Sequence, residues 1–519
     1  MYKLGIDVGG TNTDAVIIDE NYNIIASVKN PTTEDIYDGI VGAVRKVLDE
    51  SGVDKSQIGQ AMLGTTQCTN AIVERKNLAK IGIIRVGAPA SCGVLPMVDW
   101  EDDIREICEK AVMVRGGYEY DGREITDLDE KACREFFREM KEKGVRSIAI
   151  SGVFSTIRND MELRVAEIAR DVMGEDVHVS ISSEIGSMGL IERENATILN
   201  AALWKIAEKF TDGFAKSMAD EGIKNATIYL SQNDGTLMTM DHARRYPILT
   251  VACGPTNSIR GASYLSKLAN AIVIDVGGTT TDIGVIQNEF PRESSVAVTI
   301  GGVRTNFRMP DVMSIGLGGG SIVRECPDGS VTVGPDSVGY ELTEKAMVFG
   351  GDIMTATDIA VRLGMADIGD SSLVENISIE LAEKALNAIR VLVEDAVDAM
   401  KVSNEDSDVI LVGGGSVVLP DKLAGAAQTV KPEHFGCANA IGSAISKVSG
   451  TLEKLINYDE IPRDQALEEA KNEAVEMAVE AGAKWDTVEI IDVEDVPLQY
   501  YPGNTNRVKV KAAGELLSS

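Results

Sequence analysis

The stretch "IDVGGTNTD" starts at Ile6, and a near copy, "IDVGGTTTD", starts at Ile274, about half the chain away. In both copies an apolar segment ends in Asp-Val, a turn rich in glycine and threonine follows, and an aspartate precedes a second apolar segment. Each copy therefore predicts two strands joined by a tight turn. Chance repetition of so ordered a string is improbable, so the repeat predicts a duplicated unit.

The turn of the repeat has the composition of an anion-binding site. Gly9 and Gly10 permit positive φ and let bare backbone approach a ligand. Successive N–H groups in such a turn form an anion-binding concavity, and Thr11 and Thr13 add hydroxyl donors. Asp7, at the strand end, can hold Mg²⁺ through water. One Gly-Gly turn indicates only a hairpin, but two copies facing each other across a cleft would hold a triphosphate from both sides.

A third glycine-rich element, "VILVGGGSVVLP", runs from Val409 to Pro420. A buried strand is predicted to end in three glycines that lead into a helix, so a flat, bulky group could lie against bare backbone. The element lacks the G-x-G-x-x-G spacing of a dinucleotide-binding turn, and the chain has no G-x-x-x-x-G-K-[ST] motif. The glycines therefore indicate a nucleotide site of another kind.

Composition excludes several classes of function. With 519 residues, 44% of them hydrophobic and 25% charged, the chain predicts a soluble globular protein of two to four compact units. A net charge of −31 repels nucleic-acid backbones and anionic lipid, so we expect neither partner. Strand-like sequence directly after Met1 and the lack of long apolar runs predict a cytoplasmic protein. The seven cysteines are dispersed, which indicates reduced thiols, and the three histidines are too scattered for a zinc motif.

The order of the expected elements predicts a mixed α/β fold in five segments. Residues 1–80 hold the first hairpin and a helix, and 81–190 an inserted α/β subdomain. Residues 191–270 hold a long connecting helix and a strand–turn region. The second hairpin and the third glycine-rich element fall in 271–450, and a helix followed by strands in 451–519.

The repeated hairpin and the late glycine strand resemble, in order, the phosphate-1, phosphate-2 and adenosine motifs of the actin, sugar-kinase and Hsp70 superfamily. Within it the chain resembles the A-type subunit of the hydantoinase/oxoprolinase family. The matching stretches include "GIDVGGTNTDAVIID", "LGTTQCTNAIVERKN", "SSEIGSMGLIERENATILNA", "IDVGGTTTDIGVI", "SIGLGGGSI" and "VGPDSVG". The resemblance implies duplicated actin-like (ribonuclease H-like) units whose mixed sheets flank a central nucleotide cleft, with an inserted α/β subdomain.

The resemblance also implies an activity, namely ATP-dependent hydrolysis of a cyclic amide of hydantoin or 5-oxoproline type. It implies that Asp7 binds Mg²⁺ and that Asp275 binds Mg²⁺ or orients or deprotonates the attacking group. Phosphates would be held by Gly9, Gly10, Thr11, Thr13, Gly277, Gly278, Thr279, Thr280 and Thr281. Gly413, Gly414 and Gly415 would face adenine and ribose. Thr65, Thr66 and Asn70 are substrate-side candidates, or equally a strand-end turn with a helix-capping side chain.

Other functions share the same hairpins. A subunit that phosphorylates a ketone or enol for carboxylation is one alternative, and an ATPase that acts as a conformational switch or reactivating factor is another. The expected partners are a small cyclic amide, a B-type hydantoinase subunit and further copies of the chain. Two local features concern the substrate side: Cys253 replaces the usual serine of the family and is expected to be a small buried residue, and Glu74 is expected to pair with Arg75.

Overall fold

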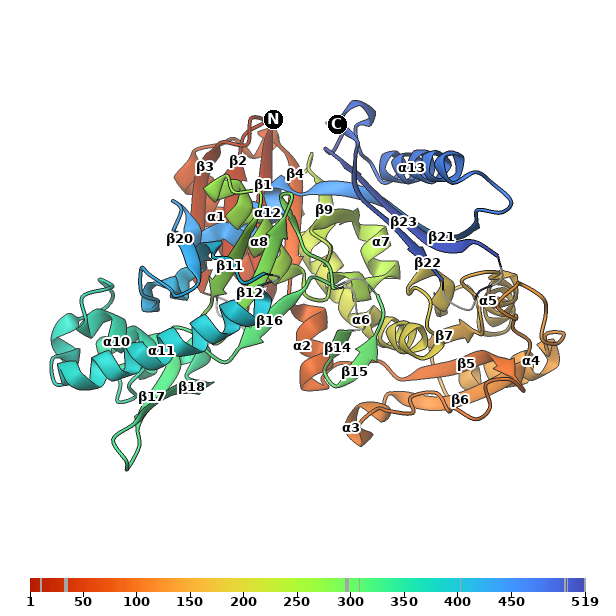
Figure 1. The fold of residues 1–519 in the computed structure, drawn as a ribbon, viewed down its shortest axis with the longest axis horizontal. Coiled ribbons are helices and arrows are strands. Elements are labelled where there is room, and N and C mark those ends of the chain that lie inside the picture. Colours follow the sequence, from red (N-terminus) through yellow and green to blue (C-terminus); the bar gives the residue numbers. More distant parts are fainter. Residues whose placement is uncertain are drawn as a thin grey trace.

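The computed structural model describes most of the chain as an α/β molecule with several mixed sheets (Figure 1). The described residues are 1–9, 12–31, 36–294, 298–307, 309–401, 403–498, 501 and 503–517. None of the helices in these ranges combines the length and the apolar character that a membrane span requires.

The first copy of the repeat forms an antiparallel hairpin in which Asp7 lies opposite Asp14. A third strand extends the hairpin, and a helix then returns the chain to a strand parallel to the first. Gly52, with φ of 65°, ends this helix and donates its N–H to the Leu48 carbonyl at 3.0 Å. The elements are β1 (Tyr2–Val8), β2 (Asn12–Ile18), β3 (Ile24–Pro31), α1 (Ile36–Ser51) and β4 (Ile58–Thr65).

The second copy repeats this arrangement. Asp275 lies opposite Asp282 in the hairpin, and the first strand again pairs in parallel with a later strand that follows a helix. The strands are β11 (Ala271–Val276), β12 (Thr281–Gln287), β13 (Phe290–Pro291), β16 (Val312–Ile315), β19 (Ser407–Val412) and β20 (Ala426–Val430). Because both sheets place the hairpin beside a parallel strand, the duplication predicted from the repeat is confirmed.

Helices and two small ribbons complete the second half. The helices α10 (Ala356–Arg362) and α11 (Ile379–Met400) pack on one face of its sheet and share a hydrophobic core with it. The other elements are β14 (Val298–Ile300), β15 (Val303–Thr305), β17 (Ser321–Glu325), β18 (Val331–Ser337) and α9 (Leu342–Lys345). The helix expected after the glycines of 413–415 is only a five-residue 3₁₀ helix, η7 (Gly414–Val418).

The inserted α/β subdomain is a parallel sheet in the order β6-β5-β7-β8, at the lower right of Figure 1. Two helices cover one face, and the 31-residue α6 covers the other. Buried Arg85 of the sheet forms a bidentate ion pair with Glu194 of α6, which joins the subdomain to the rest. The elements are β5 (Ile81–Ala88), α3 (Asp102–Arg105), β6 (Cys108–Arg115), α4 (Glu130–Glu142), β7 (Ser147–Gly152), α5 (Asp160–Met173), β8 (His178–Ile181) and α6 (Leu190–Asp220).

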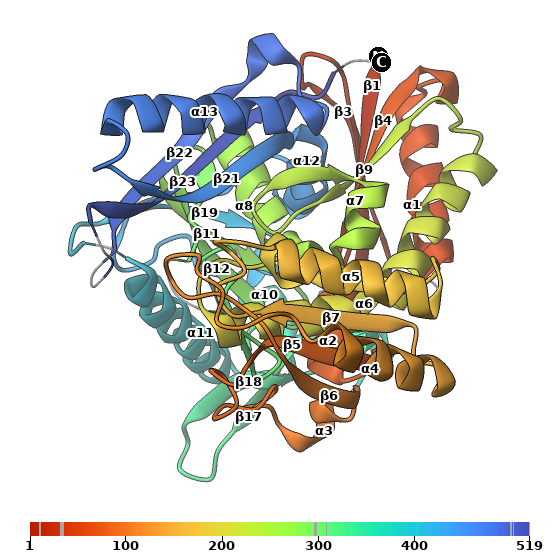
Figure 2. The ribbon, with the colours of Figure 1, turned by 90° about the vertical axis from the view of Figure 1, so that its right-hand side faces the viewer.

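The C-terminal strands extend the first sheet to nine strands among the described residues. Helix α13 lies across one face of these strands and packs through alanines spaced four apart, which lets it approach the sheet closely (Figure 2). The elements are β9 (Thr227–Ser231), β10 (Thr236–Thr239), α7 (Met240–Arg245), β21 (Lys447–Asn457), α13 (Arg463–Glu480), β22 (Glu489–Pro497) and β23 (Thr505–Gly514). The five-segment division of the chain stays a prediction.

Two helices lie between the duplicated sheets and contact each other closely. They are α8 (Cys253–Ser266), which packs on the second hairpin, and α12 (Ala438–Ile445), which packs on the first. A Cβ on Gly261 would overlap the Ala438 carbonyl, and a Cβ on Gly442 would overlap the Asn257 carbonyl. The two sheets are therefore held together through a crossing that requires glycine on both helices.

We expect Gly442→Ala to lower the melting temperature by several degrees, since overpacking a close contact costs about 1–3 kcal/mol. Differential scanning fluorimetry measures the change. Gly213→Ala in α6 is the matched control, because a Cβ there meets nothing within 4 Å. An unchanged melting temperature for Gly442→Ala would show that the two helices can separate at no cost.

Candidate functional site

A cleft of about 490 Å³ opens between the two hairpins. Its walls come from both hairpin turns, from the glycine turn after β19, from α2 (Gln67–Glu74) and from the start of α8 and α12. The lining residues are Asp7, Gly9, Asn12, Asp14, Lys29, Thr66, Asn70, Glu74, Gly254, Pro255, Ser258, Asp275, Val276, Gly277, Gly278, Thr279, Thr280, Asp282, Gly413, Gly414, Gly436, Ala438 and Asn439.

Most of the site residues expected from the sequence meet in this cleft. Those that line it are Asp7, Gly9, Thr66, Asn70, Asp275, Gly277, Gly278, Thr279, Thr280, Gly413 and Gly414. Gly10 and Thr11 lie outside the described residues. The remaining four lie behind the walls: Thr13, Thr65, Thr281 and Gly415.

Three of the four residues behind the walls make contacts that hold the fold. Thr281 is buried and donates its hydroxyl to the Leu317 carbonyl at 2.7 Å. Buried Thr65 accepts the Gln67 N–H at 3.3 Å, as a residue of a strand-end turn does. A Cβ on Gly415 would overlap the Gly277 carbonyl, so this glycine permits close packing behind the second turn.

Each hairpin contributes two carboxylates to the cleft, one from each strand. Asp14 and Asp282 join the expected Asp7 and Asp275. The sequence held the signal for the two additional aspartates, because each is the last residue of the repeated nine-residue string. Carboxylates at equivalent positions of the two copies therefore face one cavity.

Asp7 is held by the two central helices at once. Its Oδ1 accepts from the side-chain amide of Asn257 on α8 at 3.4 Å, and its Oδ2 accepts from that of Asn439 on α12 at 3.0 Å. Neither asparagine was expected from the sequence. Gly64 of β4 lies beside Asp7, and a Cβ on Gly64 would overlap the Asp7 carboxylate. A Cβ on Gly413 would overlap the Asp275 carboxylate in the same way.

The glycine cluster "GLGGGS" supports the second turn from behind. Gly319 donates its N–H to the Gly277 carbonyl at 3.0 Å, and Gly320 donates to the Gly278 carbonyl at 2.7 Å. A Cβ on Gly318 would lie 2.6 Å from the backbone nitrogen of Thr279. The cluster, to which the sequence assigned no role of its own, fixes the position of the turn.

Burial raises the pKa of each of the four hairpin aspartates in the cleft. The pKa of Asp7 rises to about 7, because the side chain is buried and the negative charge of Asp14 lies close. The pKa of Asp282 rises to about 6 through burial, opposed by a hydrogen bond from Ser314. Burial also raises the pKa of Asp275, opposed by a hydrogen bond from Ser258.

Lys29 is the single cationic side chain among the described residues that line the cleft. Its Nζ lies 2.8 Å from both oxygens of Asp14. Burial is the largest single influence and acts to lower the pKa of Lys29, but the charge of Asp14 and the hydrogen bond to it, together with the nearby charges of Cys437 and Asp275, outweigh burial and the pKa is raised. A Cβ on Gly414 would lie 3.7 Å from the Lys29 Cε, so this lysine reaches from β3 to the glycine turn of the second half.

The chemistry of the carboxylates fits the expected Mg²⁺. Magnesium prefers oxygen ligands and is usually held by one or two carboxylates together with phosphate oxygens. The described residues contain no group of three or more histidine, cysteine or acidic side chains placed to hold a metal without further ligands. Asp7 and Asp275 as Mg²⁺ ligands stay a prediction.

Helix α2 presents a polar stripe to the cleft. Thr66, Asn70 and Glu74 recur every four residues, so they lie on one helix face, and all three line the cavity. Thr66 precedes the helix but makes no capping hydrogen bond with its side chain. The Asn70 amide donates to the Thr66 hydroxyl at 3.4 Å. The stripe starts at the first hairpin, where the Thr66 hydroxyl donates to the Val8 carbonyl at 3.4 Å, and ends at the exposed side chain of Glu74, which we call the mouth of the cleft.

The expected pairing of Glu74 with Arg75 is wrong. Arg75 has a left-handed φ of 58° at the end of α2, which turns its side chain to Glu101 at 3.0 Å and Asp103 at 3.2 Å. Glu74 instead pairs with Lys76 at 3.0 Å on the surface. The backbone conformation, which the sequence does not reveal, decides between the two partners.

Cys253 is buried and its Sγ lies 3.3 Å from the Thr65 carbonyl oxygen. Burial, with the charge of Asp7 adding, raises the pKa of its thiol to about 12. The thiol is therefore protonated at neutral pH and fills space behind the cleft, as expected from the sequence.

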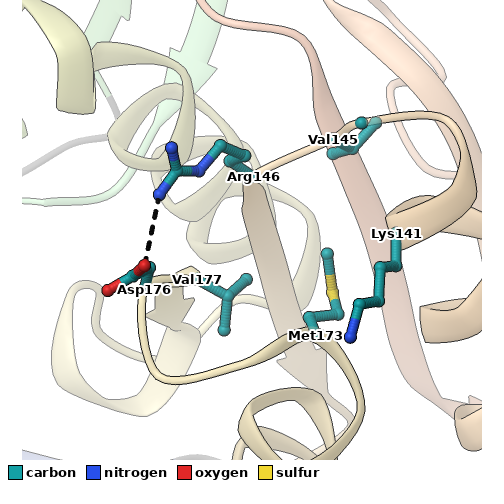
Figure 3. Close-up of a pocket in the computed structure, with 7 residues that line it drawn as sticks. Lys141, Val145, Arg146, Met173, Asp176 and Val177 are labelled. Atoms are coloured by element: carbon teal, nitrogen blue, oxygen red, sulfur yellow. Dashed lines mark ion pairs between the residues drawn. The ribbon is translucent and has the colours of Figure 1, made fainter.

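A second hollow, of about 340 Å³, lies at the edge of the inserted subdomain (Figure 3). Arg146 and Asp176 face each other across it at 3.9 Å. It contains none of the residues expected at the site, and its position before the strands β7 and β8 places it away from the duplicated hairpins.

We expect Gly318→Ala to weaken binding of a nucleoside triphosphate by about tenfold or more, because the new Cβ displaces the second turn from its anion-binding position. Titration of a fluorescent triphosphate measures the affinity. Gly213→Ala should bind as the wild type does. An affinity of Gly318→Ala equal to that of the wild type would show that the second turn does not take part in binding the triphosphate.

The raised pKa of Asp7 predicts a pH-dependent stability. The protonated carboxyl favours the folded state fully below the unfolded pKa of 3.8, and this contribution is lost as the pH rises to about 7. Asp7→Asn has no carboxyl group to ionise, so its stability should not fall in this pH range. The melting temperature of Asp7→Asn minus that of the ligand-free wild type should therefore be roughly 3 °C larger at pH 8 than at pH 5. Asp176→Asn, which is exposed, is the control; a pH-independent difference for Asp7→Asn would contradict the raised pKa.

Two family models match the chain. Residues 3–173 match the hydantoinase/oxoprolinase N-terminal region, and residues 193–368 match the hydantoinase/oxoprolinase model. The solved structure of the ATP-dependent caprolactamase from Pseudomonas jessenii superposes with a TM-score of 0.77 at 18% identity, covering 99% of this chain and 88% of that one. The chain therefore shares the fold of this protein, and the expected mixed α/β fold with duplicated units is confirmed.

The sequence relatives include enzyme subunits and enzymes. The chain is 25% identical over 477 residues to caprolactamase subunit alpha of Pseudomonas jessenii, covering 88% of this chain and 67% of the relative. It is 26% identical over 394 residues to the acetophenone carboxylase gamma subunit of Aromatoleum aromaticum, covering 70% of this chain and 53% of the relative. It is 24% identical over 413 residues to 5-oxoprolinase of Saccharomyces cerevisiae, covering 70% of this chain and 31% of the relative. The chain thus spans between about a third and two thirds of these relatives' length, and it belongs to the hydantoinase/oxoprolinase family.

Proposed function

We propose that this chain is an ATP-dependent hydrolase of cyclic amides, or the ATP-using subunit of one. The observation that carries the proposal is the convergence of two repeated turns, each with a carboxylate at its base, on one cleft between duplicated sheets. Backbone N–H groups of the turns supply anion binding, and the carboxylates supply oxygen ligands for Mg²⁺.

The two ends of the cleft differ in a way that orients the ligands. The strand parallel to the first hairpin, β4, leads into α2 with its polar stripe, whereas β19 leads into the bare glycines of 413–415. A flat adenosine fits against bare backbone, so we place it at the glycine end. The triphosphate then lies between the turns, and the amide lies beside Thr66 and Asn70.

The proposed reaction explains why ATP is needed. Closure of a five-membered lactam is favoured by the proximity of its amine and carboxyl groups, so opening the ring needs a coupled reaction. Transfer of the γ-phosphoryl group to the amide oxygen releases ADP and removes amide resonance. Water then adds to the ring carbon, the C–N bond breaks with the amine as leaving group, and a second water releases phosphate from the acyl phosphate.

The residues of the cleft have proposed parts in this reaction. Asp7 binds Mg²⁺, and Asp275 binds Mg²⁺ or orients and deprotonates the attacking group. Phosphoryl transfer depends mainly on positioning and charge neutralisation, which the turns and the bound cation provide. The raised pKa of both carboxyl groups means that proton uptake and release occur closer to neutral pH than for exposed aspartates.

A second candidate is a carboxylase-type subunit that phosphorylates a ketone or enol. The acetophenone carboxylase gamma subunit, at 26% identity, favours it. Because several relatives are named as subunits, we also propose that the chain acts with a partner subunit. ADP release stimulated by a small ketone, and not by a cyclic amide, would select the carboxylase alternative.

We expect Asp7→Ala and Asp275→Ala to lower ADP release at least a hundredfold, since each removes a carboxylate at the phosphoryl group. A coupled assay with hydantoin, 2-pyrrolidone, ε-caprolactam, 5-oxoproline and small ketones measures the rate, with the chain alone and with added partner subunit. Asp176→Ala is the control, because this aspartate is exposed and distant from the cleft. Wild-type rates in either cleft variant would disprove the assigned roles.

A further inference from the structure

We propose that the substrate end of the cleft selects an uncharged cyclic amide and rejects a ring that carries a carboxylate; this inference rests on the proposed function. Two features of the described cleft support it. The substrate wall carries an acidic side chain, and the single cationic side chain of the lining is committed elsewhere.

The acidic side chain is Glu74, at the outer end of the α2 stripe. It lines the same cavity as Asn70 and Thr66, which lie one and two helical turns further in, respectively. The side-chain amide of Asn70 offers both a donor and an acceptor, which matches the C=O and N–H of a ring amide. A ring that binds to Asn70 therefore lies next to the Glu74 carboxylate, and a carboxylate on that ring meets a like charge.

The cationic side chain is Lys29, which lies at the other end of the cavity. Its Nζ is bound to both oxygens of Asp14 at 2.8 Å. Its Cε lies close to the positions that a Cβ would take on Gly414 and on Gly436, at the glycine end. Lys29 is therefore placed to meet the nucleotide and not a substrate beside α2.

The two cationic residues that follow Glu74 in the chain are already paired with acidic groups. The Arg75 guanidinium is bound to Glu101 and Asp103, and it also donates to the Ile72 carbonyl at 2.6 Å. Lys76 pairs with Glu74 itself, but both side chains are at least half exposed, so the pair contributes little and is screened by salt. A substrate carboxylate would therefore have to displace the two carboxylates that hold Arg75, or settle for a weak, screened contact with the exposed Lys76.

The test compares two lactams with the same five-membered ring, 2-pyrrolidone and 5-oxoproline, which differ by one carboxylate. Binding is read as the concentration-dependent rise in melting temperature at pH 8 with Mg²⁺ and a non-hydrolysable ATP analogue. We expect 2-pyrrolidone to bind at least about tenfold more tightly to the wild type, because the carboxylate of 5-oxoproline meets the like charge of Glu74 and gains no compensating cation. Equal or tighter binding of 5-oxoproline overturns the inference, and so does the absence of binding by both.

Glu74→Gln keeps the shape and removes the charge. We expect it to reduce the ratio of the two affinities, 2-pyrrolidone over 5-oxoproline, by about fivefold, which is the effect of one like-charge contact near water. Glu476→Gln on the exposed face of α13 removes the same charge elsewhere and should leave this affinity ratio unchanged. An unchanged ratio in Glu74→Gln overturns the inference. Loss of 5-oxoproline binding in Lys76→Met also overturns it, because Lys76 would then be the partner of the substrate carboxylate.

Failure of the inference is distinguishable from failure of the proposed function. If 2-pyrrolidone binds preferentially but does not stimulate ADP release, the selectivity stands and cyclic-amide hydrolysis fails. If 5-oxoproline stimulates ADP release as well as 2-pyrrolidone does, the proposed function stands and the selectivity fails.

Discussion

The crossing of α8 and α12 is the contact on which the site depends. Glycines at the crossing bring two helix backbones together, and each helix packs on the hairpin of a different sheet. The distance between the two hairpin turns is therefore set by backbone contact, which tolerates little variation. The same helices supply Asn257 and Asn439, so both halves of the molecule orient the carboxylate of Asp7. Packing between the halves and positioning of the site are consequences of one contact.

The sequence predicts those parts of the fold and the site that are encoded locally. The repeated string is sufficient for both hairpins, because strand alternation and turn composition act over a few residues. Asn257 and Asn439 could not be predicted in this way, since they reach Asp7 across 250 and 432 residues of chain. The partner of Arg75 was missed for another reason: a left-handed φ at a helix end redirects a side chain, and no periodic pattern reveals it. Asp14 and Asp282 lay within the repeat and could have been included on the same grounds as Asp7.

Duplication has produced a symmetric frame with two chemically different ends. The carboxylates, and the glycines packed against Asp7 and Asp275, have counterparts in both halves. The next elements differ, because one parallel strand continues into a helix with polar side chains and the other into bare glycines. The symmetry between the two halves therefore accounts for the paired turns that would bind a triphosphate. The difference between the elements that follow the two parallel strands accounts for a cleft with one end for a nucleoside and another for a second small molecule.

The buried carboxylates oppose folding and are retained by the sheets around them. Taking charges out of water is unfavourable, which is why the pKa values of Asp7 and Asp282 are raised. Each of these aspartates is part of a strand whose neighbours are apolar and buried, so packing of the strand fixes the carboxylate in place. A bound cation with its phosphates would relieve the same repulsion. A loss of stability at such a site is the usual sign that its residues are selected for ligand binding and not for folding. Here the loss of stability arises at the aspartates that occupy equivalent positions in the two halves of the chain.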